Sequence, residues 1–599
     1  MKNKRTYLFV GMILFGLLSI TILHFFRDNR EVSNYKDDTA SISTDINTDD
    51  DDEKIDWSLY ETMEYELSKS LNITKEGIYH LTGTIEDGLV TVNTNGNVKL
   101  ILDSVSIKNS SGPAIYVEEA ENVVIATING TTNSLEDASS YQGYDSDVVG
   151  TIFSHDDLIL DGEGILKVIS NCEDAIVSKD DLKIIRGTYQ ITSSDDGIRG
   201  KDSVYIKDGD FTIQSKGDGI KTTNDTDSEK GFILIENGTF SINASSDGIQ
   251  AETKLLIQNG TFDITTGSGS SITSLHEEWG RFGSSDSSDG SSAKGLKARD
   301  NLVIENGNFT IDSSDDAIHC NHYLGIKNGV YHISSGDDGI HADTQLIIDG
   351  GEIEIIQSYE GLESSSITIN SGNISIVSSD DGINAGGGND ASAMNRPGQN
   401  SFSESSNYVL TIRGGTIYVN ASGDGLDSNG SIYMYDGSVT VDGPTNSGNG
   451  ALDYDREFVI YGGTLIAGGA SGMAQGVSNS SSIYNVLIHF TSNYGDSDTI
   501  TITDSNNQEI ISYHSTKSYS SLVVASPELK NENTYTIKVN GDEYQTFTIS
   551  SITTNVGTMG MMGGMKGNPG DPGSEPNRHS GGGPGADSSG RKGESPRDY

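Results

Sequence analysis

A short acidic turn recurs along the chain, and its carboxylates are the residues best suited to chemistry. It reads Ser-Ser-Asp-Asp-Gly-Ile at residues 193–198 and again at residues 378–383. Near copies carry one or two acids, then Gly or Ala, then Ile or Leu. The acids directly before the small residue are Asp196, Asp218, Asp247, Asp316, Asp338, Glu360, Asp381 and Asp424. A further acid precedes some of these, at Asp195, Asp315, Asp337 and Asp380.

The turns follow a regular period. The small residues at Gly197 and Gly219 are 22 residues apart, and so are those at Ala317, Gly339 and Gly361. A fixed period of this size indicates stacked repeats, in which equivalent residues of neighbouring units lie about 4.8 Å apart. The acids would then form a column.

A carboxylate column needs counter-ions. Two carboxylates about 4 Å apart repel by roughly 1 kcal/mol in water, and by several times more near a protein surface. Ca²⁺ prefers such oxygen ligands. We therefore predict Ca²⁺ as a cofactor, with the metal ligands Asp195, Asp196, Asp218, Asp247, Asp315, Asp316, Asp337, Asp338, Asp380, Asp381 and Asp424. The alternative is that each Asp only accepts hydrogen bonds from amides of its turn.

The residue after each Ile or Leu should point outward beside this column. These residues are Arg199, Lys221, Gln250, Lys297, His319, His341, Glu363, Asn384, Asp427 and Asp453. The row is basic at its start and acidic at its end. Arg and Lys next to metal-loaded carboxylates could hold a polyanionic sugar. We expect the sugar site at the early turns, and calcium-only or purely structural turns later; a solvated mixed-charge face is the alternative.

The predicted ligand-binding residues are Arg199, Lys221 and Lys297, together with Trp279. Trp279 lies in an insertion at residues 267–293 and is a candidate for stacking on a sugar ring. A plain polar loop is the alternative for that insertion. The two histidines of the row alone do not indicate metal ligands.

The positioning elements are short strands. Each unit of about 22 residues holds two Gly turns and room for three strands that alternate apolar and polar residues. Such coils stack into an all-β, right-handed parallel β-helix, which we expect over residues 57–481. At residues 482–550 the repeat is replaced by longer alternating strands, which predict a small β-sandwich-like domain that covers the sheet edge.

The ends of the chain differ in composition. Residues 1–6 are a basic flank expected in the cytoplasm, and residues 7–26 are an apolar run whose length fits a membrane span of about 20 residues. An acidic disordered linker is expected at residues 27–56 and a disordered Gly/Met/Pro-rich tail at residues 551–599. We predict a single-pass cell-membrane protein with an extracellular bulk, or a secreted one if residues 7–26 are a cleaved signal peptide.

The charge balance limits the partners. The 87 acidic and 38 basic residues give a formal charge of −49. This excess of acid argues against binding to nucleic acid, which requires a basic surface. It suits an extracellular protein that meets divalent cations, and we expect a monomer.

Several motifs together resemble a known family. They are Gly-Ile-Tyr-His-Leu-Thr-Gly at residues 77–83, the acidic turns, Ser-Ala-Lys-Gly-Leu-Lys-Ala at residues 292–298, the stretch at residues 386–400, and the Gly/Met-rich tail. Across residues 57–550 the chain is similar to bacterial carbohydrate-binding β-helix proteins that bind cellulose and polygalacturonic acid and carry Ca²⁺. The resemblance implies this fold, calcium in the acidic turns and binding of acidic sugars.

Three functions remain open. The first is a non-catalytic, calcium-dependent binder of uronate polysaccharides and cellulose. The second is a polysaccharide lyase, because the fold is also similar to that of calcium-dependent pectate lyases, in which a Lys or Arg beside Ca²⁺-binding Asp residues abstracts a proton; Lys221 and Arg199 would take that role. The third is a structural or adhesive surface protein. We favour the first, since basic neighbours are equally expected in a binder.

Overall fold

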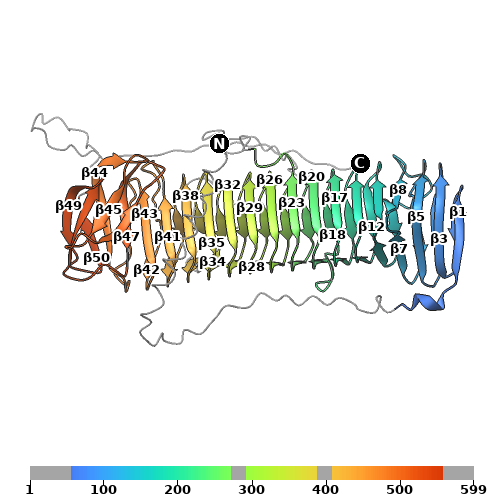
Figure 1. The fold of residues 1–599 in the computed structure, drawn as a ribbon, viewed down its shortest axis with the longest axis horizontal. Helices are drawn as coiled ribbons and strands as arrows, with labels where there is room; N and C mark the ends of the chain where they lie inside the picture. Colours follow the sequence, from blue (N-terminus) through green and yellow to red (C-terminus); the bar gives the residue numbers. More distant parts are fainter. Residues whose placement is uncertain (1–54, 272–291, 387–407, 558–599) are drawn as a thin grey trace, which may run out of the picture. The chain divides into compact units, whose positions relative to one another are not determined.

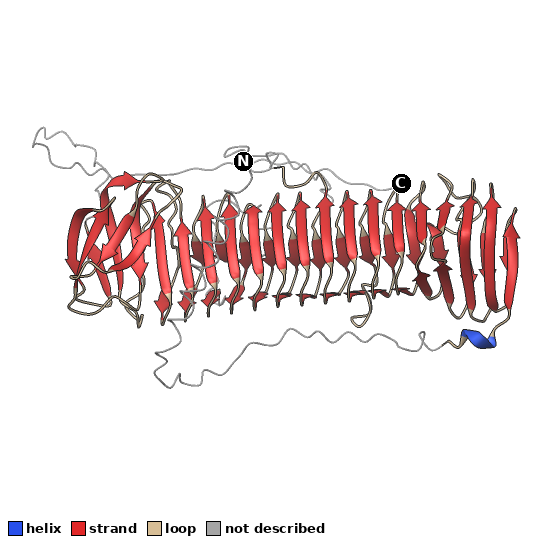
Figure 2. Ribbon diagram, viewed as in Figure 1, coloured by secondary structure: helices blue, strands red, loops and turns tan. Residues whose placement is uncertain are grey.

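The computed structural model describes residues 55–271, 292–386 and 408–557. Apart from the short 3-10 helix η2 (Trp57–Leu59), every helix or strand in these ranges is a β-strand (Figure 2). The all-β class is therefore confirmed. No helix in the described ranges is long and apolar enough to cross a membrane. The predicted anchor at residues 7–26 lies outside these ranges, as do residues 558–599 of the predicted tail at residues 551–599. The described start of that tail contains a strand, β50 (Thr553–Val556), and is therefore ordered.

One coil consists of three strands. β15 (Ile198–Gly200), β16 (Ser203–Ile206) and β17 (Asp210–Ser215) follow one another, and the acidic turn then leads into β18 (Ile220–Thr222). β18 pairs in parallel with β15, with Ile220 opposite Ile198. Each coil therefore lies on the previous one at the period read from the sequence.

The first strands of the coils form a parallel sheet of 14 strands. Its members are β2 (Leu71–Ile73), β4 (Val90–Asn93), β6 (Ile115–Glu119), β9 (Gly150–Ser154), β12 (Asp174–Ser178), β15, β18, β21 (Ile249–Ala251), β24 (Leu296–Ala298), β27 (Ile318–Cys320), β30 (Ile340–Ala342), β33 (Leu362–Ser364), β36 (Ile383–Ala385) and β39 (Leu426–Ser428).

The second and third strands form two further parallel ladders. The second strands are β1 (Thr62–Leu67), β3 (Gly77–Ile85), β5 (Val98–Lys108), β7 (Val123–Thr127), β10 (Leu158–Gly162), β13 (Asp181–Ile184), β16, β19 (Phe232–Ile235), β22 (Lys254–Ile257), β25 (Asn301–Ile304), β28 (Tyr323–Ile326), β31 (Gln345–Ile348), β34 (Ser366–Ile369), β37 (Val409–Ile412), β40 (Ser431–Met434) and β42 (Glu457–Ile460). The third strands are β8 (Thr132–Glu136), β11 (Ile165–Ile169), β14 (Thr188–Thr192), β17, β20 (Thr239–Ala244), β23 (Thr261–Thr266), β26 (Asn308–Ser313), β29 (Val330–Ser335), β32 (Glu352–Gln357), β35 (Asn373–Ser378), β38 (Thr416–Ala421), β41 (Ser438–Asp442) and β43 (Thr464–Gly469).

The long strand β5 joins these two ladders, because it pairs with both β7 and β8. Figure 1 shows the strands of successive coils side by side in the order of the sequence. Three parallel ladders wound by one chain form a parallel β-helix. Its right-handedness stays a prediction, which rests on the preference of parallel crossovers.

Aromatic rings stack at the spacing of the paired strands. The rings of Phe211, Phe240 and Phe262 stack inside the helix with centroids 4.7 Å apart and almost parallel planes. The turn before each of these strands requires glycine: Gly238 has φ +144°, and a Cβ there would lie 2.8 Å from the ring of Phe240. Side chains at equivalent positions of neighbouring coils are therefore held about one strand spacing apart.

The chain direction changes after the last coil. β47 (Tyr519–Ala525) pairs antiparallel with β43 and with β44 (Asn485–Tyr494), and β50 (Thr553–Val556) pairs with β44. β45 (Ile500–Thr503), β46 (Glu509–Tyr513), β48 (Thr534–Val539) and β49 (Asp542–Thr548) form a separate antiparallel sheet. Both groups of strands contribute to one apolar core. The sandwich-like domain itself stays a prediction.

Candidate functional site

The predicted acids lie in one column, which we call the carboxylate ladder. The backbone N–H of many of these acids donates to the Oδ1 of the acid one coil earlier, whereas the N–H of Asp316 donates to Oδ1 of Asp315 at 2.9 Å. The N–H of Asp218 donates to Asp196 at 2.8 Å, and that of Asp247 to Asp218 at 2.8 Å. The same bond joins Asp338 to Asp316 at 3.0 Å. One oxygen of each of these carboxylates therefore fastens the next turn, as the turn-stabilising alternative expects.

Sequence reasoning missed two members of the ladder. Asp174 accepts from the N–H of Asp196 at 3.0 Å and precedes the predicted column by one coil. Lys294 occupies the ladder position after Asp247, to which its N–H donates at 2.8 Å. Both stand directly before a small residue, at Ala175 and Gly295, so the spacing that marked the other acids also marks them.

The outward residues also align, and we call them the outer row. Arg199 pairs in register with Lys221, and Gln250 with Lys297. His319 and His341 are likewise paired. The structure therefore brings the predicted basic residues beside the carboxylate ladder. Trp279 lies outside the described residues.

In the early coils, the second oxygen of each acid has a cationic partner from the protein. Nη2 of Arg199 lies 2.8 Å from Oδ2 of Asp174. Nζ of Lys221 lies 2.7 Å from Oδ2 of Asp218, and Nζ of Lys297 lies 3.0 Å from Oδ2 of Asp247. Each of these carboxylates therefore has a protein cation beside it.

The protonation of these groups bears on catalysis. Burial raises the pKa of Asp174 to about 7 and that of Asp218 to about 6, although cations oppose the shift. Burial acts to lower the pKa of Lys221, but the charges of Asp218 and Asp196 outweigh it and raise that pKa. A lysine that holds its proton more tightly is a poorer general base at neutral pH. Lys221 is therefore poorly prepared for the proton abstraction of a lyase.

Lys294 provides the cation of the next coil. Its Nζ lies 2.6 Å from Oδ2 of Asp316 and 2.9 Å from Oδ1 of Asp315. Burial alone would raise the pKa of Asp316, but the charges of Lys294 and His319 hold it well below its usual value. Asp315, Asp316 and Asp337 can bring one oxygen each within 4.8 Å of one another, but Lys294 already reaches two of these acids.

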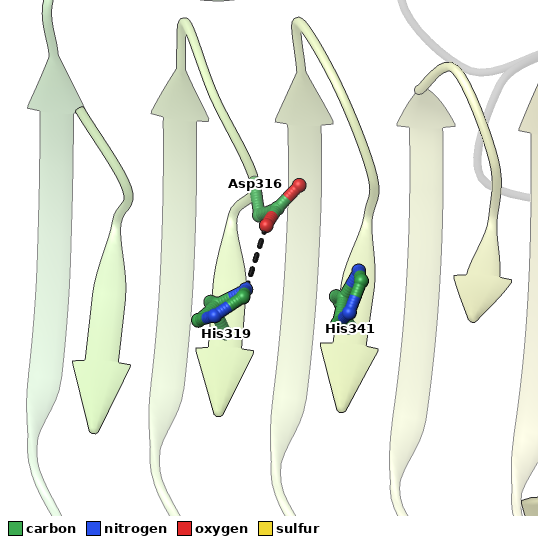
Figure 3. A group of neighbouring side chains, drawn as sticks. All are labelled: Asp316, His319 and His341. Carbon is green, nitrogen blue, oxygen red and sulfur yellow. Dashed lines mark hydrogen bonds and ion pairs between the residues drawn. The ribbon is translucent and has the colours of Figure 1, made fainter. Parts of the chain in front are cut away.

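The middle coils place two buried histidines beside the ladder. Figure 3 shows His319 and His341 on neighbouring coils with their rings on the same side, and Asp316 above His319. Nδ1 of His319 lies 2.8 Å from Oδ2 of Asp316. The centroids of the two imidazole rings are 4.9 Å apart. The outer row is thus buried at this point.

His341 has three acidic neighbours. Its Nδ1 lies 3.0 Å from Oδ2 of Asp338 and 2.9 Å from Oε2 of Glu363, and its Nε2 lies 3.1 Å from Oδ1 of Asp343. Burial lowers the pKa of His341, but its contacts with these three acids raise it well above the ordinary value. Burial and the neighbouring charges of Asp316 and Glu363 raise the pKa of Asp338 well above its ordinary value.

In the late coils, acid faces acid. Burial together with Asp380 and Asp427 raises the pKa of Asp381 to about 9. Burial together with Asp424 and Asp453 raises the pKa of Asp427 to about 8. Within the described ranges, no Lys, Arg or His lies within ion-pair distance of these two acids.

These donor sets differ in how well they suit Ca²⁺, which takes six to eight oxygen ligands. The early acids already have Arg or Lys side chains where a metal ion would bind. The exposed Asp195, however, lies with Asp174 and Asp196 in a group whose ligand atoms are all within 4.8 Å of one another. The late coils offer carboxyl oxygens with no protein cation beside Asp381 or Asp427 in the described ranges. No three of the described late acids, however, bring their ligand atoms within 4.8 Å of one another.

Comparison with known proteins points to carbohydrate. The family described as "Carbohydrate-binding domain-containing protein" matches residues 68–339. A protein of that description from Acetivibrio thermocellus is 35% identical over 128 residues, which are 20% of this chain and 45% of the relative. This chain thus spans less than half of that relative's length.

Among solved structures, the chain is similar to a polysaccharide lyase-like protein from C. thermocellum, determined as a gadolinium derivative. The identity is 31%, the match covers 34% of this chain and 91% of the other, and the TM-score is 0.33. The family match at residues 68–339 contains the early coils of the ladder and extends to Asp338, but ends before His341 and Glu363.

Proposed function

We propose that this chain is a non-catalytic, calcium-dependent carbohydrate-binding protein of the cell surface, which favours acidic uronate polysaccharides and also takes cellulose. It acts as a monomer, anchored through residues 7–26. The observation that carries the proposal is the basic part of the outer row. Arg199, Lys221 and Lys297 are 21%, 29% and 25% exposed, so each reaches solvent while its charge is held over the ladder.

These side chains can bind sugar carboxylates without leaving their Asp partners. A lysine ammonium has three N–H donors and an arginine guanidinium has five. Lys221 has one close Asp partner, at 2.7 Å, so donors remain for a ligand. Charge-assisted hydrogen bonds to carboxylate are among the stronger polar contacts, and Arg can make two in parallel. Neighbouring coils repeat this opportunity at the strand spacing, which suits a polymer.

Calcium would act in the late coils. Asp381, Asp424 and Asp427 would supply carboxylate oxygens, and the ion would offset their mutual repulsion. When bound, it would supply positive charge that can also attract a uronate carboxylate. The chain's own part is to hold these acids in register: Oδ1 of Asp381 accepts the N–H of Asp424 at 2.6 Å.

Affinity electrophoresis of the full chain on gels containing polygalacturonate tests this proposal. With Ca²⁺, the wild type should be retarded, and a chelator should weaken the retardation. Replacing Arg199, Lys221 and Lys297 together by Ala should abolish it. Lys327→Ala is the matched control, because Lys327 is an exposed lysine that pairs with Glu305 at 3.0 Å away from the ladder. Migration of the wild type that polygalacturonate and Ca²⁺ leave unchanged would refute the proposal.

The same protein and polygalacturonate also distinguish the two alternative functions, a lyase and a structural or adhesive protein. A lyase would release unsaturated uronides with new ultraviolet absorbance, which Lys221→Ala should remove. A purely structural or adhesive role predicts that a chelator lowers the melting temperature while no glycan binds.

A further inference from the structure

We propose that the middle coils bind one divalent transition-metal ion of the zinc class, with Nδ1 of His341, Oδ2 of Asp338 and Oε2 of Glu363 as protein ligands and water in the fourth position. This site is separate from calcium in the late coils, and it does not depend on the proposed function. The argument rests on geometry, hydrogen bonding and charge.

The three donor atoms already surround one point. They lie within 4.8 Å of one another. Nδ1 of His341 is 3.0 Å from the Asp338 oxygen and 2.9 Å from the Glu363 oxygen. Tetrahedral zinc with bonds of about 2.0–2.1 Å separates its ligand atoms by roughly 3.4 Å. Small side-chain movements would therefore admit the ion.

Two carboxyl groups crowd Nδ1 of His341. An oxygen of each approaches this one nitrogen, yet an imidazole nitrogen carries at most one hydrogen, directed along a single line in the ring plane. Without a metal, Asp338 and Glu363 share a further proton in the hydrogen bond between their carboxyl groups. A metal ion at the same place would replace both protons and bind both oxygens and the nitrogen together.

The other side of the imidazole is arranged as in metal sites. Oδ1 of Asp343 lies 3.1 Å from Nε2 of His341. When Nε2–H donates to this carboxylate, the lone pair of Nδ1 is left for a metal. A ligating histidine usually donates its second ring nitrogen in this way, which fixes its tautomer and orientation. Asp343 is therefore a positioning residue.

Burial and charge also call for a cation. The side chains of His341, Asp338 and Glu363 are 1%, 8% and 10% exposed. Within the described ranges, no Lys or Arg forms an ion pair with Asp338 or Glu363; the cation beside them is His341 itself when it is protonated, and a metal would displace its Nδ1 proton. Buried carboxylates are costly unless they are paired or bind metal. Mixed imidazole and carboxylate ligands suit zinc and its neighbours better than Ca²⁺, which takes oxygen ligands.

The neighbouring coil provides a matched comparison. His319 is equally buried and contacts Asp316 in the same way, at 2.8 Å. There, however, Lys294 reaches the same Asp316 oxygen at 2.6 Å and already provides a positive charge. His319 should therefore be dispensable for metal binding, although it stacks near His341.

The test uses the full chain, purified in detergent without a histidine tag, stripped with a chelator and titrated with Co²⁺ and Zn²⁺. We expect one Co²⁺ per chain with the absorption bands of tetrahedral cobalt, displaced by Zn²⁺ and retained in a large excess of Ca²⁺. His341→Ala and Glu363→Gln should weaken binding by on the order of 100-fold or more, and Asp343→Asn by about 10–100-fold. His319→Ala should bind as the wild type does.

Glu363→Gln keeps the size of the side chain, and circular dichroism establishes that each variant is folded. Wild type that binds no Co²⁺ or Zn²⁺ would overturn the proposal, and so would His341→Ala that binds as tightly as wild type. Loss of binding in His319→Ala equal to that in His341→Ala would overturn the assigned ligand set. Failure of polygalacturonate binding would leave these titrations unchanged, so the two proposals fail separately.

Discussion

Replacing Asp381 by Asn should stabilise the calcium-free protein at neutral pH. Burial and neighbouring acids raise the pKa of Asp381 to about 9 in the fold, against 3.8 for an ordinary Asp. Between these values the folded chain binds a proton that the unfolded chain has released. Unfolding free energy therefore falls as pH rises, by about 1.4 kcal/mol per pH unit for one such group.

From pH 3.8 to pH 7 this slope gives an upper bound of about 4 kcal/mol for Asp381. The side chain is only half-buried and water screens part of its charge, so we expect roughly half of this, about 2 kcal/mol. Asn removes the charge but keeps an oxygen that accepts the N–H of Asp424, which the Asp381 oxygen accepts at 2.6 Å. Little stability should therefore be lost from the hydrogen bond between the turns.

The assay is thermal unfolding with chelator at pH 5 and at pH 7.5. Asp381→Asn should melt above wild type at pH 7.5 by on the order of 3 °C, and the gap should shrink at pH 5. Calcium should stabilise wild type more than the variant. Asp316→Asn is the matched control in the same ladder position. The pKa of Asp316 is lowered in the fold, so its charge adds stability above pH 3.8, and that variant should melt lower at pH 7.5.

The reasoning would be refuted if Asp381→Asn were no more stable than wild type at pH 7.5 in chelator. A gap of equal size at both pH values would also refute it, because the effect must follow the titration of a carboxylate.

Two further predictions concern the scaffold and are checked by thermal or denaturant unfolding. Lys294→Ala should destabilise the fold by about 3–5 kcal/mol, because it leaves Asp316 buried without its lysine partner. A change below about 1 kcal/mol would contradict this and show that His319 alone is enough to pair with the Asp316 carboxylate. Gly238→Ala should destabilise by about 1–3 kcal/mol, since its φ is +144° and a Cβ would lie 2.8 Å from Phe240. Gly130→Ala, also at positive φ but with no atom within 4 Å of the new Cβ, should cost less; equal effects would assign the cost to φ alone.

The sequence was sufficient to predict the period, the three strands per coil and the phase of the ladder. The turn residues recur every 22 residues, and parallel pairing in register keeps that phase, as for Ile198 and Ile220. The sequence was not sufficient to show which oxygen of each acid accepts a backbone N–H, since this depends on the directions of the amides within the turn. The bond from the Asp218 N–H to Asp196 is an example.

Charge compensation was the harder part to predict. Lys294 follows Asp247 in the ladder, but 47 residues separate them in sequence, so the insertion hides their contact. The long side chain of Lys221 also reaches back over the acids rather than only outward. The expectation of a sugar site in the early coils and calcium-only or purely structural turns in the late coils came from residue types alone. The pairing distances add that the early acids already have protein cations beside them.

The three-residue strands of the 14-stranded sheet separate the interior of the protein from its surface chemistry. In Ile198–Gly200, Ile249–Ala251 and Leu296–Ala298, the first and last residues point inward and stay aliphatic or small, whereas the middle residue is a partly exposed Arg, Gln or Lys. Because each coil contacts mainly its neighbours, one middle residue can change without repacking the core. Selection can therefore alter what the surface binds one coil at a time, and duplication of a whole coil would extend the surface without a new fold.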